Sequence, residues 1–167
     1  MMEEFDGLAS ISQQIEITAR NYGVLIEPLG EEDTSELIQS FVAKFCNCNY
    51  ERYMWEGMCK AVEEVSLECV AVSNDNGWQW IGEFINDSAI MFFNHSDEKR
   101  AYSFGNGEDI VKVLSDCYDF EFYVTNTVLD YVMCFSHHRI LYATGNVVDM
   151  VRKYKTVQYD FFTKSAK

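Results

Sequence analysis

Two adjacent histidines and an arginine are the residues whose types could most readily do chemistry. His137, His138 and Arg139 follow a strongly apolar run that ends at Ser136. Imidazoles bind metals and transfer protons near neutral pH, and a neighbouring guanidinium can hold an anion. Adjacent residues of an extended chain point to opposite faces, and His95 lies in a distant loop, so we expect no metal site. A hairpin end without chemistry is the simplest interpretation, and contact with a partner or ligand is the alternative.

Two tryptophans and an acidic run are further candidates for contact with a partner. Trp78-Gln-Trp80 would place both indoles on one face of a predicted strand, where they are either core or an exposed aromatic platform. Glu31-Glu32-Asp33 would present carboxylates to a basic protein, although plain solubility is the favoured explanation of any individual charge. The residues predicted to contact a partner are therefore Glu31, Glu32, Asp33, Trp78, Trp80, His137, His138 and Arg139.

No catalytic or cofactor signature is recognised in the sequence. Phosphate-binding glycine loops, zinc-protease motifs and the serine-hydrolase elbow are missing, so we predict no cofactor, no metal and no enzyme activity. Cys46-Asn-Cys48 lacks the second cysteine pair of a zinc site. Asp116, Asp119 and Glu121 are expected on a solvated surface rather than as an acid–base pair.

The stretch 120–154 must position the histidines. Its pattern predicts strands over 120–125, 129–135 and 140–144, with the histidines in the last hairpin turn, and then a helix capped by Asn146. Both faces of 129–135 are apolar, which is typical of a central strand covered on both sides. A similar strand–glycine–asparagine–helix order over 102–114 predicts either recurring cap chemistry or a repeated unit with both helices on one sheet face.

The remaining elements place helices before strands. Apolar stripes predict helices over 8–22 and from 33 or 34 to about 46, and allow one over 50–64. Short strands are predicted at 24–26, 67–72, 78–85 and 89–93. The sequence thus predicts one α+β domain over 1–167, with an antiparallel or mixed sheet of about five to seven strands, N-terminal helices and two late helices packed on it.

The composition limits the classes of partner. The chain has 27 acidic and 13 basic residues and a formal net charge of −14, which disfavours nucleic acid and suits a basic protein. The acidic N-terminus carries no long apolar run, so we expect neither a signal peptide nor a membrane span. Six cysteines without such a signal indicate reduced thiols and a cytoplasmic location.

The segment Cys134-Phe-Ser-His-His-Arg-Ile-Leu141, followed by Gly145 and a helix, resembles the C-terminal part of small acidic bacterial proteins of unknown function, which are similar to toxin-immunity proteins. Their pattern has Asn-His-His-Asp, so His137, His138 and Gly145 match, whereas Ser136 replaces Asn and Arg139 replaces Asp. The resemblance covers roughly 120–154. It implies a protein that neutralises a toxin by binding it.

Three functional hypotheses follow. The first is a cytoplasmic bacterial protein that binds another protein, such as an immunity protein that occludes a basic toxin. The second is a small-ligand-binding domain or small enzyme that uses the His137–His138 hairpin, which requires one of the imidazoles to line a concave site beside a polar partner and to have a perturbed pKa. The third is a structural subunit of an assembly. The sequence leaves the oligomeric state open.

Overall fold

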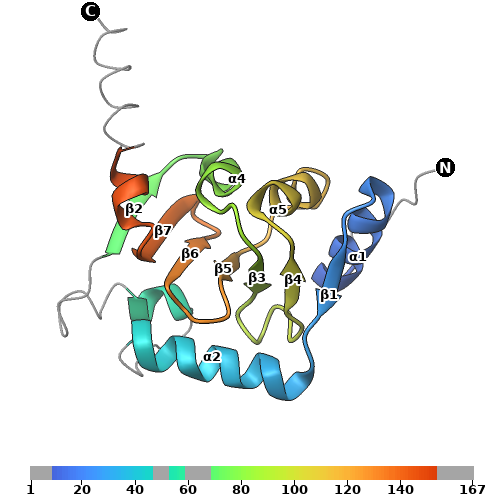
Figure 1. Ribbon diagram of the computed structural model, residues 1–167, viewed down its shortest axis with the longest axis horizontal. Coiled ribbons are helices and arrows are strands. Elements are labelled where there is room, and N and C mark those ends of the chain that lie inside the picture. The colour runs from blue at the N-terminus through green and yellow to red at the C-terminus, as the bar shows by residue number, and fades with distance from the viewer. Residues whose placement is uncertain (1–8, 47–52, 59–68, 154–167) are drawn as a thin grey trace, which may run out of the picture.

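The fold is built on one antiparallel sheet with helices on both faces (Figure 1). The computed structural model describes residues 9–46, 53–58 and 69–153. The seven strands lie in the order β1-β4-β3-β5-β6-β7-β2. Their bounds are β1 Ile26–Pro28, β2 Cys69–Ser73, β3 Ala89–Phe92, β4 Tyr102–Phe104, β5 Phe122–Thr125, β6 Tyr131–Phe135 and β7 Ile140–Gly145. The α+β prediction, including the number of strands, is confirmed.

Strand side chains alternate between two cores, as the period of two requires. Phe122 and Val124 of β5 enter one core, and Tyr123 enters the other. All five residues of β6 are buried, which confirms the prediction of a central strand covered on both sides. The central strands are therefore rigid supports for whatever follows at their ends.

Helices α1 (Ile11–Tyr22), α4 (Ile81–Phe84) and α5 (Gly107–Leu114) cover one face, together with helical residues 148–153. Ser10 and Gln13 form a reciprocal capping box at the start of α1, and Gly23, at φ 66°, ends the helix in the left-handed conformation. The Asn106 side chain caps α5 by accepting from Asp109 N. The two late helices pack into the same core, as the hypothesis of a repeated unit expects, although the second helix begins one residue later than predicted.

Helix α2 (Glu31–Phe45) and the helical turn at residues 54–58 cover the opposite face (Figure 1). Phe41 and Phe45 of α2 pack with Met54 and Met58 of that turn. Helix α2 begins two to three residues earlier than predicted, with three carboxylates in its first turn that suit the positive end of the helix dipole. The predicted helix over 50–64 lies partly outside the described residues.

The predicted strand at 78–85 is wrong. Residues Gly77–Trp80 form the 3-10 helix η1, which continues directly into α4. Trp80, Ile81 and Ile85 are buried while Gln79 and Glu83 are exposed, which is the spacing of a helix rather than of a strand. The two indoles therefore do not share a strand face.

None of the helices within the described residues is long and apolar enough to cross a membrane.

Candidate functional site

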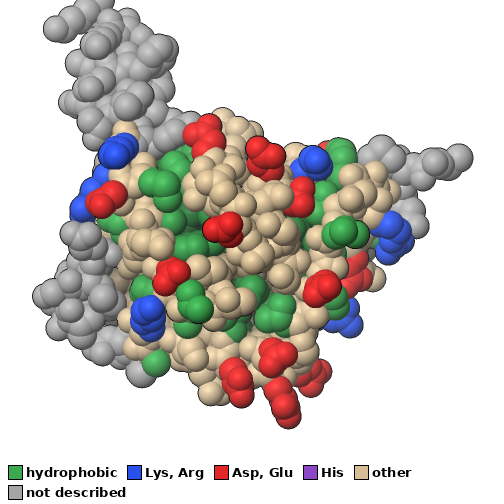
Figure 2. Space-filling view, in the orientation of Figure 1, with side chains coloured by type: hydrophobic (Ala, Val, Ile, Leu, Met, Phe, Trp, Pro, Cys, Tyr) green, Lys and Arg blue, Asp and Glu red, His purple; other side chains and the backbone are tan. Residues whose placement is uncertain are grey.

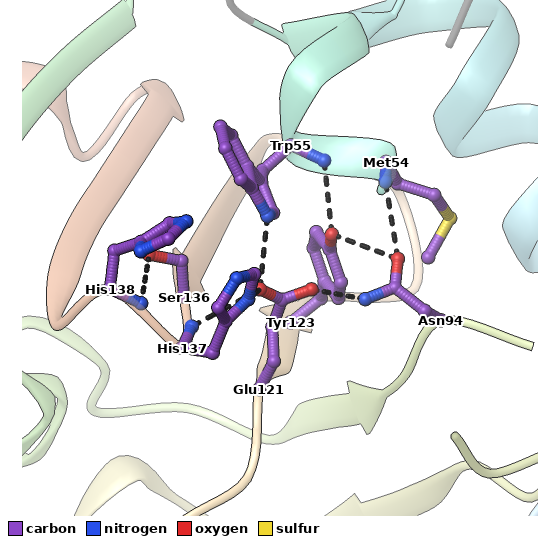
Figure 3. A network of polar contacts seen from close by, with 8 residues as sticks. All are labelled: Met54, Trp55, Asn94, Glu121, Tyr123, Ser136, His137 and His138. Carbon is purple, nitrogen blue, oxygen red and sulfur yellow. Dashed lines mark hydrogen bonds and ion pairs between the residues drawn. The ribbon is translucent and has the colours of Figure 1, made fainter. Parts of the chain in front are cut away.

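Polar residues converge where three central strands end. Strand β5 pairs with β3 on one side and with β6 on the other, with Tyr123 opposite Phe92 and Phe122 opposite Phe135. The residues just beyond these ends therefore meet at one edge of the sheet: Asn94 after β3, Glu121 before β5, and the turn 136–139 after β6. Trp55, from the helical turn 54–58, covers them (Figure 3).

The centre of this site is the carboxylate of Glu121, whose side chain is only 3% exposed. Its Oε1 accepts from the Trp55 indole (2.9 Å) and from the backbone N–H of His137 (3.2 Å), and lies 3.0 Å from His137 Nδ1. Its Oε2 accepts from the side-chain amide of Asn94. An ionised carboxylate offers about four acceptor sites, so these four contacts satisfy a charge that would otherwise be costly to bury.

A second set of hydrogen bonds fixes the covering turn. Asn94 Oδ1 accepts from Met54 N and from the Tyr123 hydroxyl, both at 3.1 Å. The same hydroxyl accepts from Trp55 N at 3.0 Å. Burial, with smaller contributions from Cys134 and Glu121, raises the pKa of Tyr123 above its ordinary value, so this hydroxyl stays protonated and can donate. Trp55 is thereby held over Glu121 from both its backbone and its indole.

The contact with Glu121 determines the tautomer of His137. A carboxylate only accepts hydrogen bonds, so the proton of a neutral imidazole must lie on Nδ1, facing Glu121 Oε1. Nε2 then carries a free lone pair on the other side of the ring. The His137 side chain is 41% exposed, so this nitrogen can accept a hydrogen bond or a proton from outside the fold.

Aromatic rings pack around the imidazoles. Trp55 stacks between Tyr53 and Tyr142, with ring centroids 6.0 Å and 5.2 Å apart. The His137 ring lies 4.9 Å from Tyr53 and 4.0 Å from His138. His138 meets the edge of Trp55, while its backbone N–H donates to Ser136 Oγ (3.3 Å). These contacts add to the hydrogen bonds in fixing the orientation of His137.

His137 lines two cavities. The first, which we call the His137 pocket, has a volume of about 200 Å³. Its wall consists of Trp78, Leu114, Ser115, Cys117, Tyr118, Asp119, Phe120, Phe122, Phe135, Ser136, His137 and Arg139. The second, of about 450 Å³, adjoins it through Phe120 and His137 and also reaches Tyr53 and Glu121. An oriented imidazole thus stands in the wall of a hollow that combines aromatic and polar side chains, which is a usual composition of a small-molecule site.

Arg139 lies at the rim of the His137 pocket in an uncommon backbone conformation. Its φ is 59°, in the left-handed region, and its N–H donates to Ser136 O to close the hairpin turn. Its guanidinium donates to Asp119 Oδ2 at 2.6 Å. A non-glycine residue in this conformation costs free energy, and such residues are concentrated at functional sites.

The Cys117 thiol in the pocket wall is not an activated nucleophile. Burial raises its pKa to about 11, so it is a neutral thiol at neutral pH. Cys46 is also buried and donates to Met54 O, while Cys48 lies outside the described residues. Within the described ranges no group of three or more potential metal ligands occurs, and His95 lines a different cavity beside α2.

The predicted contact residues divide into three places. His137, Arg139 and Trp78 line the His137 pocket, and His138 packs beside it. Trp80 is 7% exposed and belongs to the core. Glu31, Glu32 and Asp33 are exposed in the first turn of α2, and do not line the His137 pocket.

Glu121, Asn94, Tyr123 and Trp55 are the site residues that sequence reasoning missed. The prediction that Glu121 lies on a solvated surface is wrong, because the residue is buried. The available signal was its place between Phe120 and Phe122, on the same strand face as Tyr123. Asp119 is solvated as expected, with its side chain 82% exposed.

Comparison with known proteins gives a family without an assigned activity. A family model described as "Family of unknown function (DUF6756)" matches residues 6–155. No curated protein and no solved structure matches the chain. Because the match spans most of the sequence, the chain belongs to this family of unknown function.

Proposed function

We propose that this member of the family binds a small molecule in the His137 pocket, with His137 as the group that recognises it. The observation that carries the proposal is the contact between the His137 imidazole and the buried carboxylate of Glu121, 3.0 Å apart, at the edge of a cavity of about 200 Å³. An imidazole lining a concave site beside a polar partner is the geometry that the ligand-binding hypothesis requires.

The buried partner supports this assignment. An exposed histidine at a hairpin end needs no oriented carboxylate, and the four donors around Glu121 offset the cost of burying its carboxylate. The oriented ring can accept a hydrogen bond or, in a reaction, a proton from the bound molecule. We therefore propose binding rather than a reaction, and the neutral thiol in the wall agrees with this choice.

A fragment screen by two-dimensional NMR tests the proposal. Small aromatic probes should shift the resonances of His137, Trp78 and Phe122 together. Ser115→Trp, which places an indole at the exposed rim of the pocket, should abolish these shifts. The matched control is Lys112→Trp, which adds the same indole to an exposed position of α5 away from the pocket. Shifts that persist in Ser115→Trp, or that never cluster at the pocket, would contradict the proposal.

A second proposal is favoured by the acidic surface. Acidic side chains gather over the first half of α2, along the lower edge of Figure 2, and Glu31, Glu32 and Asp33 are exposed there. Such a surface would steer and bind a basic protein by charge complementarity, as in a cytoplasmic bacterial immunity protein that occludes a toxin. The net charge of −14 supports this proposal.

Charge reversal tests the second proposal. A single basic protein captured from the native host should be lost after Glu31→Lys, Glu32→Lys and Asp33→Lys are combined. Asp75→Lys, at an exposed position far along the chain, should leave capture intact. Equal capture by both variants would remove α2 as the contact surface. Neither variant touches the His137 pocket, so the two proposals are separated by these experiments.

A further inference from the structure

We infer that the His137 pocket takes an uncharged molecule of about one six-membered ring that carries a hydroxyl or N–H group, which donates a hydrogen bond to Nε2 of His137. This inference rests on the proposed ligand-binding function and deepens it. Size, polarity and charge each limit the class of ligand.

The volume of the pocket sets the size. It measures about 200 Å³, somewhat more than the roughly 150 Å³ of an engineered apolar cavity that holds benzene. Trp78, Phe122 and Phe135 supply aromatic walls for such a ring. One ring with one or two substituents fits this space.

The tautomer of His137 sets the polarity of the ligand. Glu121 holds the proton of the neutral ring on Nδ1, and no described residue donates to Nε2, so this nitrogen is an acceptor. A ligand group beside it must therefore donate. A ligand carbonyl or ether in that place would leave two lone pairs facing each other, which is unfavourable.

The charges around the pocket favour a neutral ligand. Asp119 already pairs with Arg139, and Glu121 already makes four contacts, so an ammonium group would have to compete with these donors for either carboxylate. An anion would compete with Asp119 for Arg139 and approach a chain with a net charge of −14. A neutral donor meets neither cost.

Four probes of one ring size separate these alternatives. 4-Methylphenol, toluene, benzoate and benzylamine are titrated into the intact, isotope-labelled chain at pH 8, above the ordinary titration range of histidine. We expect 4-methylphenol to bind at least about fivefold more tightly than toluene, because it adds one hydrogen bond to a well-placed acceptor. Benzoate and benzylamine should both bind more weakly than 4-methylphenol.

Two variants assign the preference to His137. His137→Phe keeps a ring in place but removes the acceptor, so 4-methylphenol and toluene should bind alike. Glu121→Gln gives Nδ1 a partner that can donate, which releases the tautomer, and the preference should again fall. His95→Phe, an exposed histidine in another cavity, is the matched control and should retain the full preference. The side-chain ¹⁵N shifts of His137 report the tautomer directly, without any ligand.

The outcomes distinguish this inference from the function on which it rests. If toluene binds in the pocket as tightly as 4-methylphenol, or a charged probe binds more tightly, the ligand class is wrong while small-molecule binding stands. A proton found on Nε2 rather than Nδ1 would also overturn it. If none of the four probes binds, the ligand class is wrong, and the wider fragment screen decides whether the pocket binds anything.

Discussion

At the scale of single residues, the site depends on one buried carboxylate. Glu121→Ala would leave the Trp55 indole and the Asn94 amide without their acceptor in a buried place. We expect this change to lower the free energy of unfolding by about 3 kcal/mol, the range for buried polar groups that lose a charged partner. Urea denaturation measures the change.

Asp119→Ala is the matched control for that prediction. Asp119 is two residues away, but its side chain is 82% exposed, so its ion pair with Arg139 contributes little. Its removal should change the free energy of unfolding by less than about 0.5 kcal/mol. Equal losses in the free energy of unfolding for the two variants would mean that burial of Glu121 does not determine its contribution to stability.

Arg139 allows a test of whether a strained backbone conformation is retained because the arginine side chain is needed there. Its φ of 59° is a conformation that glycine adopts without cost. Arg139→Gly should therefore raise the free energy of unfolding by about 1 kcal/mol. It should lower the affinity of any ligand that contacts the guanidinium. Thermal denaturation and probe titration measure the two effects. A destabilised glycine variant would show that the guanidinium contributes more to stability than the turn loses in strain.

At the scale of elements, the close approach of α4 and α5 depends on Gly107. A Cβ at this position would lie 2.7 Å from Ile85 O and still closer to Ile81 O, and Gly107 N donates to Ile85 O at 2.9 Å. Gly107→Ala must push the helices apart, so we expect a loss of about 1–3 kcal/mol in the free energy of unfolding.

Gly105→Ala is the control for this contact. The nearest atom to a Cβ there is a side-chain oxygen of Asp109 at 3.7 Å, which is ordinary contact. It should be close to neutral in the same chemical denaturation. If Gly107→Ala were equally neutral, the close approach of α4 and α5 would not depend on the absence of a side chain at this position.

The elements also show what sequence could and could not predict. Alternating residues predicted β5 and β6, and the short polar turn before Ile140 predicted β7 as the next strand. Cap residues such as Asn106 and Gly23 predicted where helices begin or end. Trp78 and Trp80 suggested a strand by residue type. The segment is helical instead, because Ile81 and Ile85 have helical spacing and pack against α5.

The site was only half predictable for a related reason. His137 and Arg139 were found by residue type, because they are adjacent and polar after an apolar strand. Glu121 and Asn94 lie far from them in sequence and meet them only through the pairing of β3, β5 and β6. Strand order is not encoded in local patterns, so the partner of His137 required the three-dimensional fold.

At the scale of the whole molecule, the burial of one thiol and two tyrosine hydroxyls predicts how stability changes at high pH. Burial raises the pKa of Cys117 from 9.0 to about 11, and those of Tyr102 and Tyr131 from 10.0 to about 12. These groups stay protonated in the folded chain when the unfolded chain has begun to ionise. Their contribution to stability is complete below pH 9 and is lost as the pH rises from there to about 12.

Urea denaturation at pH 8 and at pH 10.5, with a reducing agent present, measures this effect. The free energy of unfolding should be lower at pH 10.5, and Cys117→Ser should show a smaller fall because it has no thiol to ionise. An unchanged or rising stability over this interval would mean that these groups ionise as readily when folded as when unfolded.

The two edge strands have a consequence for the order in which the chain assembles. Strands β1 and β2 come from the first half of the sequence, yet they pair with β4 and β7, so that Ile26 lies opposite Phe104 and Val70 opposite Ala143. The hairpins β5–β6 and β6–β7 close much shorter loops, and short loops close at lower entropic cost. The centre of the sheet should therefore form first. During synthesis, α1 and α2 leave the ribosome before the strands that their apolar faces cover.

Pulse-labelled hydrogen exchange during refolding measures this order. The amides of β5, β6 and β7 should become protected before those of β1 and β2, and the reverse order would refute this sequence of events.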